Sequence, residues 1–196
     1  MDIDAEGTGD TMMENETIRA IFQRRSVRAY KPEQLTDEQV QTLLHCAIAA
    51  PSARNAQPWH FTVIQNQALL DDFAEAFRQC ALDADEEWIQ KLGENPDYHV
   101  FFHAPTVVLI SARADEKGFN LGLAAQNMVL AAQSMGLGSV ILGLPMRVFN
   151  RSEGQDLSLR LKLPNDVRPF MCVALGYPDQ TPNARPRNFD VAEWVR

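Results

Sequence analysis

Residues 118–146 contain no lysine, arginine, aspartate or glutamate, and this stretch limits the possible folds more than any other. A membrane-spanning helix would be one explanation, but the asparagines, glutamines and glycines along the stretch make it a poor one. The better interpretation is a helix over residues 118–135 that solvent barely reaches. A surface helix normally keeps one charged face, so this helix is expected to pack against a second subunit as well as its own sheet. The sequence therefore predicts a homodimer with this helix near its centre.

The length of the chain predicts one domain. Its 196 residues, 45% of them hydrophobic, can form one sizeable core but are too few for two. We expect a single domain over residues 16–196 and a flexible extension over residues 1–15. That extension lacks the basic and apolar regions of a secretory signal.

Charge and cysteine usage disfavour several classes of protein. A formal net charge of -8 argues against nucleic acid and against an anionic membrane surface, because both need a basic face. The three cysteines, Cys46, Cys80 and Cys172, form no C-x-x-C pair that would suggest a zinc ribbon or a dithiol centre. Free thiols are typical of a reducing compartment, so we expect a cytoplasmic protein.

Against this acidic background, residues 24–28 carry a cluster of positive charge. Arg24, Arg25 and Arg28 surround Ser26, which adds a hydroxyl and a backbone N–H to the same small volume. Guanidinium groups match phosphate oxygens well, so the cluster predicts one wall of a site for a phosphate-bearing cofactor. The alternative is a solvated basic patch at the end of a surface helix.

The C-terminal segment brings more positive charge. Residues 177–196 are rich in proline near their start and are predicted to form an extended arm that carries Arg185 and Arg187. If either arginine meets the Arg24 cluster, the combined charge requires an anion between them.

A second polar segment lies between a predicted helix and a predicted strand. Residues 51–59 are dense in small polar groups and have a proline near each end, so they can present donors to a flat heterocycle while moving little. An ordinary helix-to-strand connection is the alternative. The candidate binding residues are Pro51, Ser52, Arg54, Asn55 and Gln57.

Residues 83–103 overlap the tail of a helical region predicted over residues 67–92, and their composition suggests a mobile lid. The candidate substrate contacts are Trp88, Tyr98, Phe101 and Phe102, although such aromatic residues more often belong to a core. His99 and His103 have the spacing of a zinc pair on a helix, but no third ligand is evident and we expect no metal site.

The other elements follow from periodicity and end signals. Helices are expected over residues 16–25, from a capping box at Thr36 and Gln39 up to Pro51, and over residues 152–161. Strands are expected over residues 60–64, 105–111, 140–145 and 170–175.

Together these segments resemble the flavin-dependent nitroreductase family. The matching motifs are residues 24–28, 51–61, 122–127 with 136–138, 175–178 and the arginines of the arm, in the order of the family. They cover nearly all of the chain after Asn15. The resemblance implies an α+β fold of three layers, with helices on both sides of a central, mainly antiparallel sheet. It also implies a homodimer with FMN between the subunits.

The resemblance further implies an oxidoreductase that moves two electrons from NAD(P)H to a small acceptor, such as a nitroaromatic or a quinone, in a ping-pong cycle. The flavin N5 would carry the chemistry, so no catalytic side chain is required. Phosphate contacts are implied for Arg24, Ser26, Arg185 and Arg187, with Arg28 near the flavin pyrimidine. Pro51, Ser52, Arg54 and Asn55 would come from the partner chain, and Leu142, Gly143 and Leu144 would lie against the isoalloxazine.

Some features depart from the family pattern or leave it open. Asn120 stands where many relatives carry an acid, and residues 83–103 match no family motif. The same scaffold resembles reductive dehalogenases and a flavin-fragmenting enzyme. A flavin-binding regulatory module without turnover is a further alternative.

Overall fold

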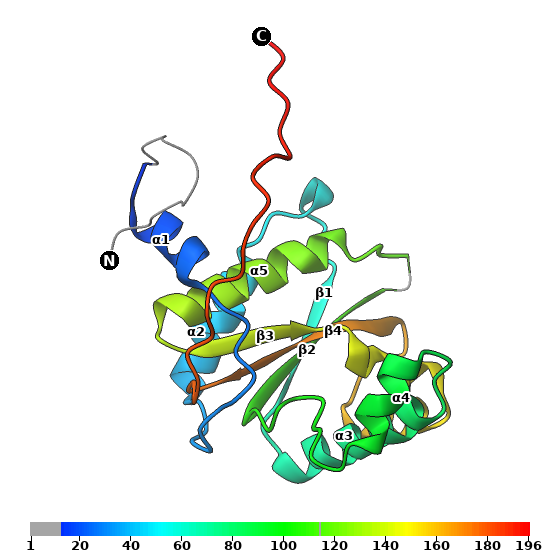
Figure 1. Ribbon diagram of the computed structural model, residues 1–196. Helices are drawn as coiled ribbons and strands as arrows, with labels where there is room; N and C mark the ends of the chain where they lie inside the picture. Colours follow the sequence, from blue (N-terminus) through cyan, green and yellow to red (C-terminus); the bar gives the residue numbers. More distant parts are fainter. Residues whose placement is uncertain (1–12, 114) are drawn as a thin grey trace.

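The computed structural model describes residues 13–113 and 115–196, which form an α+β fold around an antiparallel sheet (Figure 1). In these residues the sheet contains β1 (Trp59–Ile64), β2 (Thr106–Arg113), β3 (Gly138–Leu142) and β4 (Val167–Gly176). The strand order is β1-β2-β4-β3, and each neighbouring pair is antiparallel. The extension predicted over residues 1–15 falls largely on residues 1–12, which lie outside the described residues.

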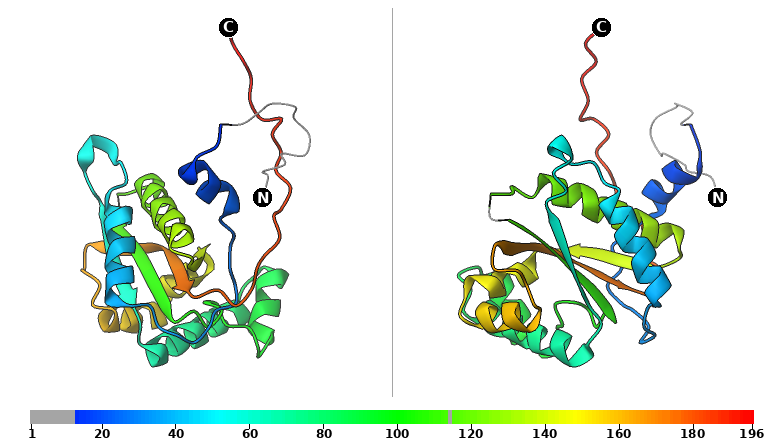
Figure 2. Two further views of the ribbon diagram at one scale, coloured as in Figure 1. Left: turned by 90° about the vertical axis from the view of Figure 1, so that its left-hand side faces the viewer. Right: turned by 180° about the vertical axis from the view of Figure 1, so that it is seen from behind.

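Helices cover both faces of the sheet and give the fold three layers (Figure 2). One outer layer contains α2 (Asp37–Ile48) and α5 (Phe119–Ser134), and α1 (Glu16–Gln23) contacts α5. The other outer layer contains α3 (Gln67–Leu82), α4 (Glu87–Glu94), the 3-10 helix η2 (Leu144–Asn150) and α6 (Glu153–Arg160). A shorter 3-10 helix, η1 (Ala53–Asn55), precedes β1.

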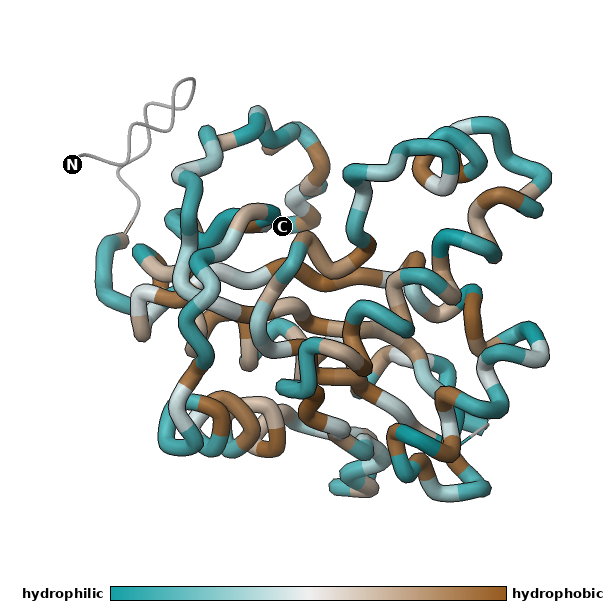
Figure 3. The backbone as a smooth tube through the Cα atoms, turned by 90° about the horizontal axis from the view of Figure 1, so that it is seen from below, coloured by the Kyte–Doolittle hydropathy of each residue, from teal (hydrophilic) through white to brown (hydrophobic). Residues whose placement is uncertain are grey.

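The sheet separates two hydrophobic cores. Side chains alternate along β2, so Val107 and Leu109 face the core under α3, while Val108 and Ile110 face the core under α5. Apolar segments accordingly run through the middle of the molecule, and hydrophilic ones lie in the outer turns (Figure 3). Because both faces of β2 are buried, its sequence reads as a continuous apolar run.

The expected strands correspond to β1 to β4, with shifted ends. The largest shifts are three residues, at the end of β3, where residues 144 and 145 already belong to η2, and at the start of β4, which begins at Val167. The capping box before α2 is confirmed, because Thr36 accepts the Gln39 amide proton and the Gln39 side chain accepts that of Thr36. On the inner face of α2, Val40, Leu43 and Ala47 are buried.

The uncharged helix is present as α5. Its inner face buries Leu121, Ala125 and Met128 under the sheet. Gly136, at φ 71°, ends the helix in the left-handed conformation that glycine tolerates best. Among the described residues, no helix is both long and apolar enough to cross a membrane.

The prediction of one helical region over residues 67–92 is wrong, because the chain forms two helices there. The chain turns after Leu82, and α4 folds back against α3 so that Ile89 becomes fully buried. Gly93 makes this close packing possible, since a Cβ at this position would lie 2.8 Å from the Leu82 nitrogen and 3.0 Å from the Arg78 carbonyl oxygen. The turn is thus a consequence of tertiary packing.

We expect the Gly93→Ala variant to lose about 1–3 kcal/mol of unfolding free energy, because the added methyl group collides with the backbone of α3. Urea unfolding of the two proteins measures the difference. Glu94→Ala is the control, because Glu94 is exposed beside the same packing site. Equal midpoints for Gly93→Ala and wild type would contradict the packing described here.

Candidate functional site

The Arg24 cluster lies on a segment that extends the sheet beside β3. Ser26 forms a parallel bridge with Ser139, and the Val27 amide donates to the Ser139 carbonyl oxygen at 3.0 Å. Gly138 permits this approach, because a Cβ there would lie 2.9 Å from a Val27 methyl carbon. The glycine turn before β3 therefore fixes the position of the cluster.

The C-terminal arm begins by pairing with the same segment (Figure 1). The Lys31 amide donates to the Tyr177 carbonyl oxygen and the Asp179 amide donates to the Ala29 carbonyl oxygen, both at 2.9 Å. These hydrogen bonds align the start of the arm with residues 24–31. Further along the arm, Arg187 lies near enough to Arg24 to influence its charge.

Arg24 is the electrostatic centre of the site. Partial burial lowers the pKa of its guanidinium, and the positive charges of Arg187 and then Arg25 lower this pKa further. The charges of Arg24 and Arg187 thus lie close enough to interact, although the two residues are 163 positions apart in the sequence, by subtraction of their residue numbers. Like charges so placed repel each other unless an anion lies between them.

The arginines of residues 24–28 and of the arm differ in their ion pairing from most other arginines in the chain. Arg78 pairs with Glu75 and Arg151 pairs with Asp83, as is usual in an acidic protein. In the described part of the chain, by contrast, no ion pair is formed by the arginines of the segment or the arm, namely Arg24, Arg25, Arg28, Arg185 and Arg187. The site can therefore accept an external anion without first breaking a salt bridge.

The members of the cluster have different local roles. The Arg25 guanidinium donates to the carbonyl oxygens of Phe22 and Arg24, so it caps the C-terminal end of α1. Arg28 points elsewhere, and its guanidinium carbon lies 5.7 Å from the centre of the Phe102 ring. Arg24 is consequently the member best placed to share an anion with the arm.

The polar loop of residues 51–58 has an unusual backbone. Arg54, Asn55 and Gln57 all adopt positive φ values, of 55°, 55° and 44°, although none is glycine. The Gln57 amide donates to the Ser52 hydroxyl oxygen at 3.0 Å, while the side chains of the three left-handed residues are exposed. Such strain with exposed polar groups is typical of a binding segment.

Asn120 fixes this loop, a role that the sequence did not reveal. Its side-chain oxygen accepts from the Ala53 amide at 3.2 Å, and its side-chain nitrogen donates to Glu116 at 2.8 Å. The only sequence signal was that position 120 carries an asparagine where many relatives carry an acid. The asparagine serves the geometry because it can both accept from the loop and donate to a carboxylate.

The loop and the Arg24 cluster lie at opposite ends of α5. Asn120 holds the loop at the start of this helix, whereas Ser26 is bound just beyond its end, at Ser139. A helix of 16 residues is about 24 Å long, so the two groups cannot share one small ligand within a single chain.

The segment around Gly143 leaves space beside the backbone. Gly143 has a φ of -97°, which any residue can adopt, and a Cβ built on it would meet no atom within 4 Å. Neither backbone conformation nor packing within the chain requires glycine here. Close approach of a ligand or of another chain is the remaining physical reason. Leu142 and Leu144 flank it and are half-buried.

The aromatic residues of 83–103 occupy different environments. Phe101 is fully buried and packs edge-on against Phe73 at 5.0 Å, so its assignment as a substrate contact is corrected to a core residue. Trp88 is 58% exposed on α4, and Tyr98 and Phe102 are partly buried and contact each other at 6.0 Å. Buried side chains, including Ile89, Val100 and Phe101, anchor the segment to the core.

A metal at His99 and His103 conflicts with their hydrogen bonds. The Nδ1 atom of His99 accepts the amide protons of Phe101 and His103, at 3.2 and 3.4 Å. In the neutral ring the proton then resides on Nε2, which leaves no free lone pair for a metal.

Comparisons with known proteins agree with this architecture. The nitroreductase family model matches residues 21–177. A protein of Archaeoglobus fulgidus, provisionally named an NADH dehydrogenase/NAD(P)H nitroreductase, is 32% identical over 83% of this chain and 86% of its own length. A Bacteroides fragilis nitroreductase structure with bound FMN has a TM-score of 0.88 at 27% identity, covering 93% of this chain and all of that one. The corresponding FMN-bound structure from Desulfitobacterium hafniense has a TM-score of 0.87 at 25% identity, covering 94% and 100%. The family match spans well over half of the sequence, and the chain therefore belongs to the nitroreductase family.

Proposed function

We propose that this protein is a homodimeric FMN-dependent oxidoreductase that moves two electrons from NAD(P)H to a small acceptor, such as a nitroaromatic or a quinone. The observation that carries the proposal is the meeting of Arg24 and Arg187 without a carboxylate among the described residues. The FMN-bound structures within the family support a flavin phosphate as the anion at these arginines.

The residues present fit such a cofactor. Arg24 and Arg187 are placed to bind the phosphate, with Ser26 and Arg185 as further donors, and Arg25 orients the segment by capping α1. The open space at Gly143 leaves room for a flat ring system beside the half-buried Leu142 and Leu144. The fit therefore rests on positive charge where the phosphate would bind and on free space where the flavin ring would lie.

Arg28 has a separate task in this proposal. Its charge lies near the aromatic pair Tyr98 and Phe102, and it follows Arg24 by four residues in the sequence. A bound flavin would supply the hydride chemistry, and Arg28 would lie near the pyrimidine, where reduction would place negative charge. A fixed guanidinium stabilises that charge without needing a proton from the protein. Accordingly, no side chain is assigned as a general acid or base.

The partner chain completes the site. The loop with Pro51, Ser52, Arg54, Asn55 and Gln57 lies about one helix length from Arg24 in the same chain, so a second copy must supply it. Uncharged residues on the outer side of α5, including Gly122 and Gln126, offer the surface for that copy. Ile21 and Phe119 add exposed apolar area, at 49% and 74% exposure.

Anaerobic stopped-flow spectroscopy tests the function directly. The FMN-loaded protein should lose its yellow colour when NADH or NADPH is added, and should regain it when a quinone or a nitroaromatic is added after the nicotinamide has been removed. Parallel lines in double-reciprocal plots of the steady-state rate would establish the ping-pong order. A flavin that binds but is reduced by neither nicotinamide would refute the oxidoreductase and favour the regulatory module.

A further inference from the structure

The turn over residues 99–103 has a strained backbone. Phe102 and His103 both have a φ of 54°, a conformation that side chains with a Cβ disfavour. The Phe102 amide donates to the His99 carbonyl oxygen at 2.8 Å, and the Ala104 amide donates to the Phe101 carbonyl oxygen at 3.0 Å. Two consecutive left-handed residues persist only where surrounding contacts hold them.

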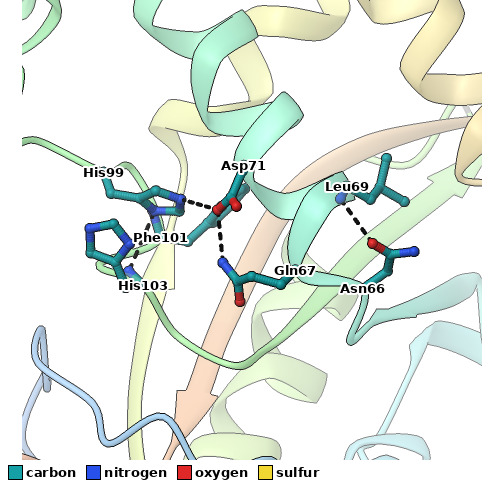
Figure 4. Close-up of polar contacts among 7 residues, drawn as sticks. All are labelled: Asn66, Gln67, Leu69, Asp71, His99, Phe101 and His103. Carbon is teal, nitrogen blue, oxygen red and sulfur yellow. Dashed lines mark hydrogen bonds and ion pairs between the residues drawn. The ribbon is translucent and has the colours of Figure 1, made fainter.

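The His99 ring supplies those contacts (Figure 4). Its side chain is 10% exposed, and its Nδ1 atom accepts the amide protons of Phe101 and His103 from the same turn. The Nε2 atom points towards Asp71 at 3.5 Å and has no hydrogen-bond partner in the described residues. Because Nδ1 must carry a lone pair to accept both amide protons, the turn requires the ring to be neutral.

The same turn reaches the proposed cofactor site. It carries the Phe102 ring, which lies 5.7 Å from the guanidinium carbon of Arg28 and packs edge-on against Tyr98. A cation over an aromatic ring is attracted by its electron-rich face, so the ring limits where the guanidinium can go.

We propose that neutral His99 is a positioning residue of the cofactor site, because its ring holds the turn that keeps Phe102 against Arg28. This inference rests on the proposed function, in which Arg28 lies near the flavin pyrimidine. It assigns a task to residues 99–103 that differs from substrate contact. Protonation of His99 at Nδ1 removes the acceptor for two amide protons and loosens the turn.

The environment of His99 favours the neutral form of its ring, chiefly because the ring is buried. His99 lines a groove of about 830 Å³ with Asp71, Glu75 and Arg78 from α3, Glu94 from α4, and Asp97 and His103 from its own segment. Burial and the neighbouring His103 lower the pKa of His99, while Asp71 opposes this shift. The unfolded chain therefore binds this proton more readily than the folded one. Stability is retained above about pH 6.5, falls as the pH drops below that value, and levels off under the lowered pKa.

Two substitutions at His99 separate the effect of the hydrogen-bond acceptor from the effect of protonation. His99→Asn keeps an acceptor near the Nδ1 position but does not titrate, whereas His99→Ala removes the acceptor. We expect His99→Ala to bind FMN about two- to fivefold more weakly at pH 8, the range of one exposed cation–π contact. His99→Asn should bind within about twofold of the wild type at that pH.

The decisive readout is the ratio of wild-type to His99→Asn affinity between about pH 8 and pH 5, measured by quenching of FMN fluorescence. The flavin phosphate titrates near pH 6 in both proteins, so its effect cancels in the ratio. We expect the wild type to lose about two- to fivefold more affinity than His99→Asn on acidification. A constant ratio, or wild-type affinity in His99→Ala, would overturn the proposal.

An NMR experiment without cofactor distinguishes this failure from failure of the proposed function. Nitrogen shifts of the His99 ring should show the Nε2–H form at neutral pH, and amide exchange at Phe101 and His103 should accelerate as the ring protonates. Binding of FMN with a constant ratio refutes only the positioning role. Absence of FMN binding in every variant refutes both, and protected amides would then leave His99 a purely structural residue.

Discussion

Replacing Arg24 by glutamine is expected to weaken FMN binding about ten- to a hundredfold, because a charge-assisted hydrogen bond contributes about 1.5–3 kcal/mol. Arg187→Gln should have a similar effect, since both side chains are placed to bind the same phosphate. Equilibrium dialysis with FMN measures the loss. Riboflavin, which lacks the phosphate, should bind the variants and the wild type with nearly equal affinity.

Arg19→Gln is the matched control, because it removes the same charge from α1 at a side chain paired with Glu14. It should leave FMN affinity unchanged. Stability of the ligand-free protein gives a second check. Arg187→Gln weakens FMN binding but relieves repulsion with Arg24, so it should not lower the unfolding midpoint. Retention of full FMN affinity in both Arg24→Gln and Arg187→Gln would remove the basis of the phosphate site.

Substituting Gly122 by leucine is expected to convert the proposed dimer into monomers. Within one chain a Cβ at Gly122 meets no atom within 4 Å, and leucine favours a helix over glycine by about 0.8–1 kcal/mol. An isolated chain would therefore be stabilised by the substitution. A partner packed closely on α5 would instead be pushed away, and bound FMN should be lost because the proposed site includes the partner's loop.

Size-exclusion chromatography with light scattering measures the mass of the Gly122→Leu variant. Ala68→Leu is the control, because Ala68 is an exposed position on α3, in the opposite helical layer. That control should remain dimeric with wild-type FMN content. A dimeric Gly122→Leu variant with raised thermal stability would show that this face of α5 is not the interface.

Local signals in the sequence predicted much of the fold. The capping box at Thr36 and Gln39 and the uncharged run of α5 depend on neighbouring residues, and both were correctly predicted. The break after Leu82 could not be seen in this way, because α3 and α4 each follow a helical pattern. The separation arises when Gly93 packs against the backbone of α3, which is a contact between elements.

The candidate site likewise combines features that local sequence signals predicted with contacts between distant residues that they could not. The arginine cluster and the arm were identifiable as cationic segments, but their approach depends on pairing between residues 29–31 and 177–179. The burial of Phe101 was not visible, since Phe101 and Phe102 are identical neighbours in the sequence. Phe101 packs against Phe73 in the core, whereas Phe102 lies in a left-handed turn and is only partly buried. Support of the polar loop by Asn120 is likewise a long-range contact.

Sedimentation velocity recorded at both the protein absorbance and the visible flavin absorbance tests most directly whether the convergent arginines bind FMN at a dimer interface. With FMN added, the two boundaries should move together at the rate of a dimer, with one flavin for each chain. A flavin that stays behind while the protein sediments as single chains would contradict both the cofactor and the shared site.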